Sequence, residues 1–108
     1  MRDPVIREFL LAFWKIHILH HAGEDGIYGQ WMLEELHRHG YRLSPGTLYP
    51  ILTRMARRGW LRASPRGRTR GPRVYRLTAR GRAVLTRVQA ALDELSHEVD
   101  THSSRRPR

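Results

Sequence analysis

Apolar residues recur at helical spacing in three separate segments of the first 60 residues. They predict helices over residues 4–21, about 27–38 and about 45–58. Asp3 followed by proline is typical of an N-cap for the first helix, and the sequence AGEDG is expected to break it after residue 21. Gly40 and Gly59 follow the second and third helices, at the position where a glycine commonly ends a helix. The chain therefore begins with three helices joined by short connections.

The periodicity changes after Gly59. Residues 60–63 and 73–77 are short runs of β-favouring residues, separated by a segment that contains two glycines and two prolines, which predicts two strands joined by a longer loop. Thr78 is then expected to cap a helix that runs to about Asp100. The apolar positions of that helix are spaced three and four residues apart, as in a heptad seam, and comprise Leu85, Val88, Leu92, Leu95 and Val99.

This order of elements predicts a mainly α fold with a small β-hairpin. It is typical of a winged helix-turn-helix domain, here residues 1–77, with an appended C-terminal dimerisation helix over residues 78–100. Residues 101–108 have nothing to pack against and are expected to be disordered. The seam favours a homodimer over packing back on its own domain, because the first helix already covers that domain.

Two prolines, Pro45 and Pro50, lie in the stretch that the third stripe assigns to a helix. If Ser44 is the N-cap, Pro45 takes the first helical position, where its missing N–H costs nothing, and Pro50 loses one bond to the carbonyl of Gly46. If Thr47 is the N-cap, Pro50 moves to the third position and loses none. We favour Ser44, because Gly46 gives the first turn room to distort. In either case both prolines lie in the opening turns of this helix.

The positive charge of the chain is concentrated in its middle. The 108 residues carry a net charge of +10, yet residues 1–35 have a net charge of −3 and residues 93–108 of −1. Residues 36–92 contain 14 arginines and no acidic residue. Such a segment repels itself unless a polyanion lies against it, and nucleic acid is the commonest such partner. The layout therefore predicts binding to nucleic acid, and charge alone would suit double-stranded DNA and RNA equally well.

Composition excludes several other functions. The chain has no cysteine, which excludes disulfides, thiolate metal sites and cysteine nucleophiles. No apolar run approaches the roughly 18 residues needed to span a bilayer, and the N-terminus has no signal-peptide pattern. A cytoplasmic protein without a membrane partner is therefore expected. The sequence also shows no phosphate-binding glycine loop and no convincing acid–base pair, so we predict neither an enzyme nor a cofactor.

The third helix combines an apolar face with a face suited to a DNA groove. With Leu48, Ile51, Leu52 and Met55 directed inward, small residues and side chains that can donate hydrogen bonds to bases or phosphates lie on the other side. The DNA-binding residues predicted on this helix are Ser44, Thr47, Tyr49, Pro50, Thr53, Arg54 and Arg57. The hairpin is predicted to add guanidinium groups for phosphates or a narrow minor groove, from Arg66, Arg68, Arg70 and Arg73.

Two stretches, LSPGTLYPILTRMARRGWL at residues 43–61 and GPRVYRLTARGR at residues 71–82, resemble the two signature segments of the PadR family of transcriptional regulators. The sequence IYGQWMLEEL in the second helix extends the similarity to most of residues 5–90. The resemblance implies a winged-helix fold, dimers formed largely through the C-terminal helix, and binding to inverted-repeat operators, usually as a repressor. Some members bind flat aromatic effectors at the dimer centre, which makes a small-molecule effector a further expectation.

The tryptophans and histidines suggest two other kinds of site. Trp14 and Trp31 lie beside the inward stripes of their helices, where they would anchor the core and the dimer interface or line an effector cavity between protomers. His17 and His21, one turn apart, could grip a transition metal. His17 also lies on the apolar stripe, however, and no cysteine or well-placed carboxylate completes a site. We therefore expect no metal site.

The sequence favours a homodimeric, sequence-specific DNA-binding regulator. Two alternatives are an RNA- or ribosome-associated winged-helix protein and an architectural DNA binder without sequence preference. RNA readers usually display stacking aromatics on an open surface, and the basic segment offers mainly Tyr49 for that purpose.

Overall fold

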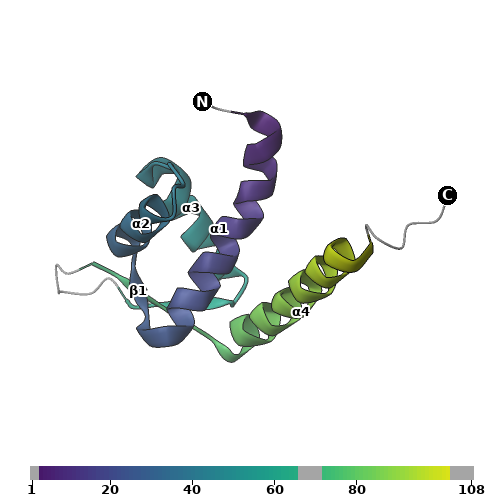
Figure 1. The fold of residues 1–108 in the computed structure, drawn as a ribbon. Helices are drawn as coiled ribbons and strands as arrows, with labels where there is room; N and C mark the ends of the chain where they lie inside the picture. The colour runs from purple at the N-terminus through teal and green to yellow at the C-terminus, as the bar shows by residue number, and fades with distance from the viewer. Residues whose placement is uncertain (1–2, 66–71, 103–108) are drawn as a thin grey trace.

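The computed structural model describes residues 3–65 and 72–102, which form four helices and three short strands (Figure 1). In chain order the elements are α1 (Pro4–Asp25), β1 (Ile27–Tyr28), α2 (Gly29–Arg38), α3 (Pro45–Arg57), β2 (Leu61–Ala63), β3 (Val74–Leu77) and α4 (Ala79–His102). The mainly α fold with a small antiparallel sheet is confirmed. α4 ends at His102, two residues beyond the predicted end, and the expectation of a disordered tail otherwise concerns residues 103–108, which lie outside the described part.

Two element boundaries predicted from the sequence are wrong. α1 does not end near residue 21 but continues to Asp25 and stops at Gly26, whose φ is 84°. Gly23, the first glycine of the AGEDG segment, lies inside the helix, and a Cβ there would press on the side chains of Leu77 and Arg82. This glycine therefore permits close packing of α1 against the later elements and does not end the helix.

The second wrong boundary concerns Ile27 and Tyr28, which form a strand and not the start of α2. β1 pairs antiparallel with β3, which lies between β1 and β2 in the sheet. Ile27 is buried opposite the buried Tyr75, so the pairing also closes part of the core. The hairpin predicted from the sequence is therefore two strands of a three-stranded sheet.

The core lies where α1, α2, α3 and the sheet meet. Each helix buries one face, and the side chains that lose nearly all contact with solvent are Trp14, Ile18, Leu19, Met32, Leu36, Leu48, Ile51, Leu52 and Met55. Burying apolar side chains of this size stabilises a domain by about 1.5–3 kcal/mol each before the loss of conformational freedom is subtracted. The stripes read from the sequence for α2 and α3 are therefore the faces that hold the domain together.

A single threonine joins α3, the sheet and α4. The hydroxyl of Thr78 accepts a hydrogen bond from the N–H of Gly81 at 3.0 Å, which confirms the predicted cap. The same hydroxyl donates to the backbone carbonyls of Gly59 and Trp60. A Cβ at Gly81 would overlap the carbonyl oxygen of Trp60, so the first turn of α4 lies directly on the chain that leaves α3. The direction of α4 is thereby tied to the end of α3.

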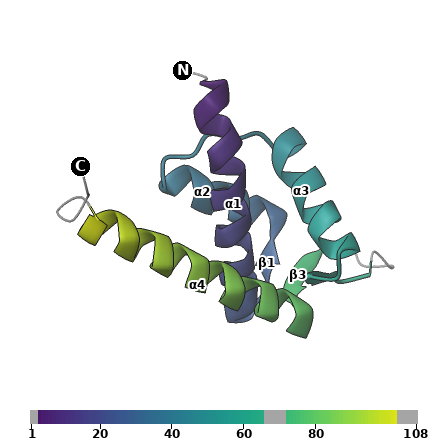
Figure 2. The ribbon, with the colours of Figure 1, turned by 90° about the vertical axis from the view of Figure 1, so that its right-hand side faces the viewer.

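α4 belongs to the domain only through its first half. Leu85 is buried in the core and Val88 is half-buried, whereas the remaining seam residues Leu92, Leu95 and Val99 are exposed. Figures 1 and 2 show the second half of α4 extending away from the other helices. The predicted seam is therefore divided, because its first member is already used inside the domain.

Glu35, in the second half of α2, is the only charged residue that is buried within the described residues. Burial acts to raise its pKa, but hydrogen bonds from His39 and Arg38 outweigh that effect, so the pKa of Glu35 lies below its ordinary value. Burial and the neighbouring rings of His39 and His21 lower the pKa of His17 on α1. The contact between α1 and the end of α2 is thus polar at its centre.

No helix in the ranges 3–65 and 72–102 is both long enough and apolar enough to cross a membrane.

Candidate nucleic-acid interface

Ser44 is the N-cap of α3, as the favoured of the two alternatives predicted. Ser44 is extended, with φ −92° and ψ 164°, and Pro45 occupies the first helical position. The carbonyl of Ser44 accepts hydrogen bonds from the N–H groups of Thr47 and Leu48, both at 3.0 Å. The Ser44 hydroxyl makes no cap bond to the backbone and lies 3.5 Å from the Thr47 hydroxyl. Both hydroxyl groups therefore lie at the open end of the helix, where an external acceptor can reach them.

The helix continues through Pro50 without a break and ends at Arg57. Pro50 has no N–H, so the carbonyl of Gly46 lacks its usual intrahelical donor. Both residues are exposed, and solvent or a ligand can satisfy that carbonyl. The cost of the proline is therefore small because it lies on the outer face near the helix start.

The outer face of α3 carries the predicted contact residues. Pro50, Thr53, Arg54 and Arg57 are exposed, and Thr47 is half-buried. Within the described residues, neither arginine forms an ion pair with a carboxylate; Arg38 is the arginine that does, with Glu35. Unpaired guanidinium groups on a helix face are free to contact phosphates or the edge of guanine.

Tyr49 is positioned by the start of α2. Its ring lies against Gly29, where a Cβ would overlap the ring atom Cε1. Gly29 is buried, whereas Tyr49 remains 40% exposed. The glycine therefore allows the ring to lie between α2 and α3 with one side open, so Tyr49 has both a structural role and an exposed surface.

The base of the hairpin is held by Ser64. Its N–H donates to the carbonyl of Val74 at 2.8 Å, and its hydroxyl accepts from the N–H of Val74 at 2.9 Å. The carbonyl of Ser64 accepts from Nε of Arg73 at 2.9 Å. Arg73 thus braces the hairpin, a role that was not predicted from the sequence because the bond joins residues on opposite sides of the hairpin loop. The other predicted wing residues, Arg66, Arg68 and Arg70, lie outside the described residues.

α3 and the hairpin lie on the same side of the domain, and α4 extends in another direction (Figure 2). The link between them is short: Gly59, with φ 79°, follows the end of α3, and the N–H of Trp60 donates to the carbonyl of Met55 at 3.0 Å. Arg58 in this link lies over the ring of Trp60, 5.1 Å from its centroid. A helix with an exposed basic face beside a hairpin is the geometry with which winged-helix domains meet duplex DNA.

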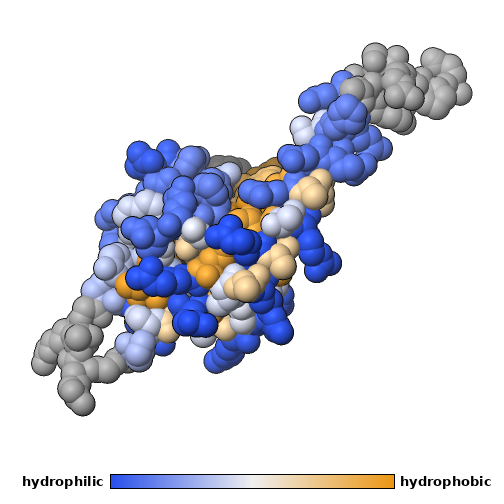
Figure 3. Space-filling view, turned by 90° about the horizontal axis from the view of Figure 1, so that it is seen from below, coloured by the Kyte–Doolittle hydropathy of each residue, from blue (hydrophilic) through white to orange (hydrophobic). Residues whose placement is uncertain are grey.

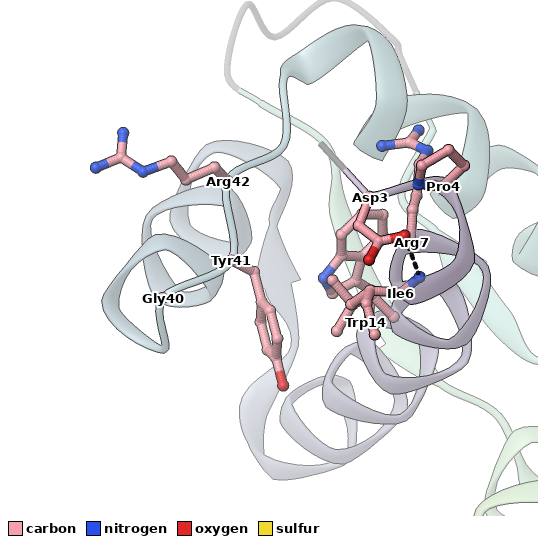
Figure 4. Close-up of a pocket in the computed structure, with 9 residues that line it drawn as sticks. Asp3, Pro4, Ile6, Arg7, Trp14, Gly40, Tyr41 and Arg42 are labelled. Atoms are coloured by element: carbon pink, nitrogen blue, oxygen red, sulfur yellow. Dashed lines mark hydrogen bonds between the residues drawn. The ribbon is translucent and has the colours of Figure 1, made fainter. Parts of the chain in front are cut away.

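The two tryptophans proposed for one effector cavity lie in different places. Trp14 is buried and lines a cavity of about 590 Å³ between the start of α1 and Tyr41 (Figure 4). Trp31 is 43% exposed and lines a separate hollow of about 230 Å³ beside Gly26. Within one chain the two tryptophans therefore line different hollows, and a cavity that they share between protomers stays a prediction.

Besides the seam of α4, an exposed apolar surface lies on α1 that was not predicted from the sequence. Its first half exposes Val5, Ile6, Phe9 and Phe13, of which Phe9 is 64% exposed. The sequence does contain a sign of this surface: residues 4–21 carry apolar residues on more of the helix circumference than is needed to cover one side of a domain. The structure assigns that excess to a surface which the described chain leaves open.

Comparison with known proteins agrees with this geometry. Residues 18–87 match the family described as the transcriptional regulator PadR-like family. The chain belongs to the PadR-like family. It is 52% identical over 97 residues to the transcriptional regulator Rv3488 of Mycobacterium tuberculosis, covering 87% of this chain and 89% of that protein. Because the family and this relative are transcriptional regulators and not enzymes, the expected class is confirmed.

Solved structures of PadR-like proteins share the fold. A PadR-like transcription factor from Bacteroides fragilis superimposes with a TM-score of 0.75 at 27% identity, covering 91% of this chain and 97% of that one. A PadR family transcriptional regulator from Eggerthella lenta gives a TM-score of 0.71 at 26% identity, covering 91% of both chains. The winged-helix fold with an appended α4 is therefore shared by PadR-like proteins of different bacteria.

The contact between Gly29 and Tyr49 yields a prediction. Gly29→Ala should lower the free energy of unfolding by about 1–3 kcal/mol, because the added methyl group must displace the ring. In a Tyr49→Ala background the same change should be neutral, or stabilising by up to about 1 kcal/mol, because alanine restricts the unfolded chain. Urea denaturation of the four proteins measures this cycle, and an equal cost of Gly29→Ala in both backgrounds would contradict the assigned contact.

Proposed function

We propose that this PadR-like regulator is a cytoplasmic homodimer that binds an inverted-repeat operator in double-stranded DNA and represses transcription. One observation carries the proposal: α3 buries its whole apolar face in the domain and exposes an opposite face with arginines and no carboxylate. That face has no use in the fold of the described chain. Its positive charge is complementary to the phosphates of DNA, and a major groove is wide enough to admit an α-helix.

In this proposal α3 reads the operator and the hairpin positions the protein. Thr53, Arg54 and Arg57 contact base edges, with Arg57 suited to a bidentate contact with guanine. Ser44, Thr47 and Tyr49 contact phosphates at the start of the helix, and Pro50 lies where the helix backbone comes closest to the groove. The arginines of the wing, namely Arg66, Arg68, Arg70 and Arg73, add affinity that does not depend on sequence.

Two exposed apolar surfaces support the homodimer. The seam on the second half of α4, from Leu92 to Val99, and the first half of α1 are both left open in a single chain. Figure 3 shows apolar surface, in orange, in the angle between the domain and α4, within a mostly hydrophilic exterior. Contiguous exposed apolar surface is unusual for a monomer, and a second copy would cover both stretches at once.

The cavity at Trp14 supports binding of an effector. The indole nitrogen of Trp14 is buried, and in the described residues no hydrogen-bond partner serves it. Figure 4 shows this nitrogen on the side that faces Tyr41. Arg7 and Asp3 also line the cavity, whereas the side chain of Arg42 points away from it (Figure 4). The carboxylate of Asp3 accepts a hydrogen bond from the N–H of Val5, and the guanidinium of Arg7 is the cation at the cavity, so a planar molecule with an acceptor and an acidic group suits it. Because Ile6 lines the cavity and is exposed, the proposed dimer interface lies beside it.

The DNA assignment predicts two classes of variant. Arg57→Ala or Thr53→Ala should reduce the preference for operator over scrambled duplex by about 1–3 kcal/mol. Arg68→Ala should weaken binding to all duplexes alike and reduce the dependence of log affinity on log salt by about one unit. Titrations at several salt concentrations measure both effects on an operator selected from a random duplex pool. Arg87→Ala, an exposed arginine on α4, is the matched control and should change neither.

The same titrations separate the alternatives. Equal affinity of the wild-type protein for operator and scrambled duplex would contradict the regulator and favour an architectural DNA binder. Tighter binding to RNA than to any duplex would favour the RNA-associated protein. Identical behaviour of the Arg57 and Arg68 variants would contradict the division between a reading helix and a positioning wing.

The dimer assignment predicts that Leu95→Glu produces a monomer, because the seam would have to bury a charge. Phe9→Glu on α1 should have the same effect if both surfaces are covered by the partner. Ala90→Glu adds the same charge on the opposite, exposed face of α4 and should leave the dimer intact. Analytical ultracentrifugation measures the outcome, with circular dichroism to show that each variant is folded. Unchanged sedimentation of Leu95→Glu would rule out the seam.

The effector assignment predicts that planar aromatic acids which release the operator act through Trp14. Trp14→Phe keeps an aromatic ring but removes the N–H donor, so the concentration for half-release should rise at least about tenfold, the loss of one hydrogen bond of about 1.4 kcal/mol. Trp31→Phe, in the separate hollow, should leave the release curve unchanged. Fluorescence anisotropy of labelled operator gives both curves. Equal sensitivity of the two variants would place the effector elsewhere.

A further inference from the structure

Three histidine rings converge where the middle of α1 meets the end of α2. His17 and His21 are one turn apart on α1, and His39 caps α2. One ring nitrogen from each of the three lies within 4.8 Å of the others. The ring centroids of His17 and His39 are 4.8 Å apart. Local spacing offers no reason to add His39 to the pair, because α2 separates His39 from His21 along the chain.

A buried carboxylate lies beside two of these three rings. Oε2 of Glu35 lies 3.2 Å from Nε2 of His39 and 3.5 Å from Nε2 of His21. No local pattern indicated this carboxylate, because Glu35 reaches the histidine pair from α2. The other oxygen of Glu35 accepts hydrogen bonds from Arg38, at 3.0 Å from one terminal nitrogen and 3.2 Å from Nε. Arg38 thus fixes the carboxylate with one oxygen turned toward the rings.

The outer nitrogen of His21 also has a carboxylate partner. Nδ1 of His21 lies 3.0 Å from Oε1 of Glu24. When that nitrogen donates to Glu24, Nε2 presents a lone pair to the carboxylate oxygen of Glu35. A nitrogen lone pair and a carboxylate oxygen only 3.5 Å apart, both on largely buried side chains, repel each other unless a proton or a metal ion lies between them. A histidine whose far nitrogen is held by a carboxylate is the usual arrangement of a metal ligand.

We propose that His17, His21, His39 and Glu35 form a binding site for a divalent transition-metal ion with the ligand preferences of Zn²⁺. Three imidazoles and one carboxylate are a donor set that Zn²⁺, Co²⁺ and Ni²⁺ accept, and the chain has no cysteine to offer a softer site. In a tetrahedral zinc site with bonds of about 2.0–2.1 Å, neighbouring ligand atoms lie roughly 3.3 Å apart. The two distances from Glu35, 3.2 and 3.5 Å, match that spacing, and the nitrogens of the three histidines lie within 4.8 Å of one another.

A second group of possible ligands shares His21 but suits an ion less well. It comprises His20, His21 and Glu24 on one helix. The side chains of His20 and Glu24 are 52% and 58% exposed, so little holds them in place. In the proposed site, by contrast, the side chains of His21 and Glu35 are 14% and 10% exposed. His20 therefore provides a matched control that lies one residue from a proposed ligand.

The test uses the full chain without a polyhistidine tag, after removal of metal by a chelator. Titration with Zn²⁺ by calorimetry should show one tight site per chain, and Zn²⁺ should raise the unfolding temperature. His39→Gln should weaken this binding by more than about 100-fold, because even partners of ligands contribute about 10–100-fold. Glu35→Gln should also weaken it, whereas His20→Gln should bind as the wild type does. His39 is half-exposed, so its variant is expected to fold, which circular dichroism checks.

Co²⁺ gives a second readout, because a four-coordinate site of nitrogen and oxygen ligands produces a strong visible absorption. The band should appear with the wild type and with His20→Gln and be absent with His39→Gln. The absence of one-to-one binding by the wild type would overturn the proposal and leave a protonated His21 as the cation that Glu35 holds. Loss of binding in His20→Gln but not in His39→Gln would overturn it in favour of the exposed group. None of these measurements involves DNA, so the result is independent of the proposed function.

Discussion

The burial of Leu48, Ile51, Leu52 and Met55 is the interaction on which the rest of the structure depends. Because all four lie on one face of α3, burying them fixes the rotation of the helix about its own axis and so determines which residues face outward. The same packing therefore provides stability and sets the orientation of the outer face.

Much of this fold could be predicted from local sequence patterns. The start of α3 follows from the rule that proline is tolerated in the first turn, and Ser44 and Pro45 take the predicted positions. The cap by Thr78 and the ends of α2 and α3 likewise depend on residues close in sequence. Periodicity and capping are local, and that is why they were sufficient here.

The features that could not be predicted depend on contacts between distant segments. β1 is two residues long, and its strand partner lies more than 40 residues further along the chain. Gly23 resembles a helix breaker until the side chain of Leu77 is placed against it. Leu85 has the spacing of a dimer seam, yet the domain core takes it. The meeting of His39 with His17 depends on how α2 crosses α1, which no local pattern encodes.

The division of α4 into an anchored half and an open half has a mechanical consequence. The helix has 24 residues, so it is about 36 Å long, and Gly81 and Leu85 fix only its first two turns to the domain. A tilt of about 10° at that base would move the far end by roughly 6 Å. In the proposed dimer, α4 therefore acts as a lever arm. Small changes in packing near its base would alter the separation of the two α3 helices and with it the spacing of the half-sites that the protein can bind.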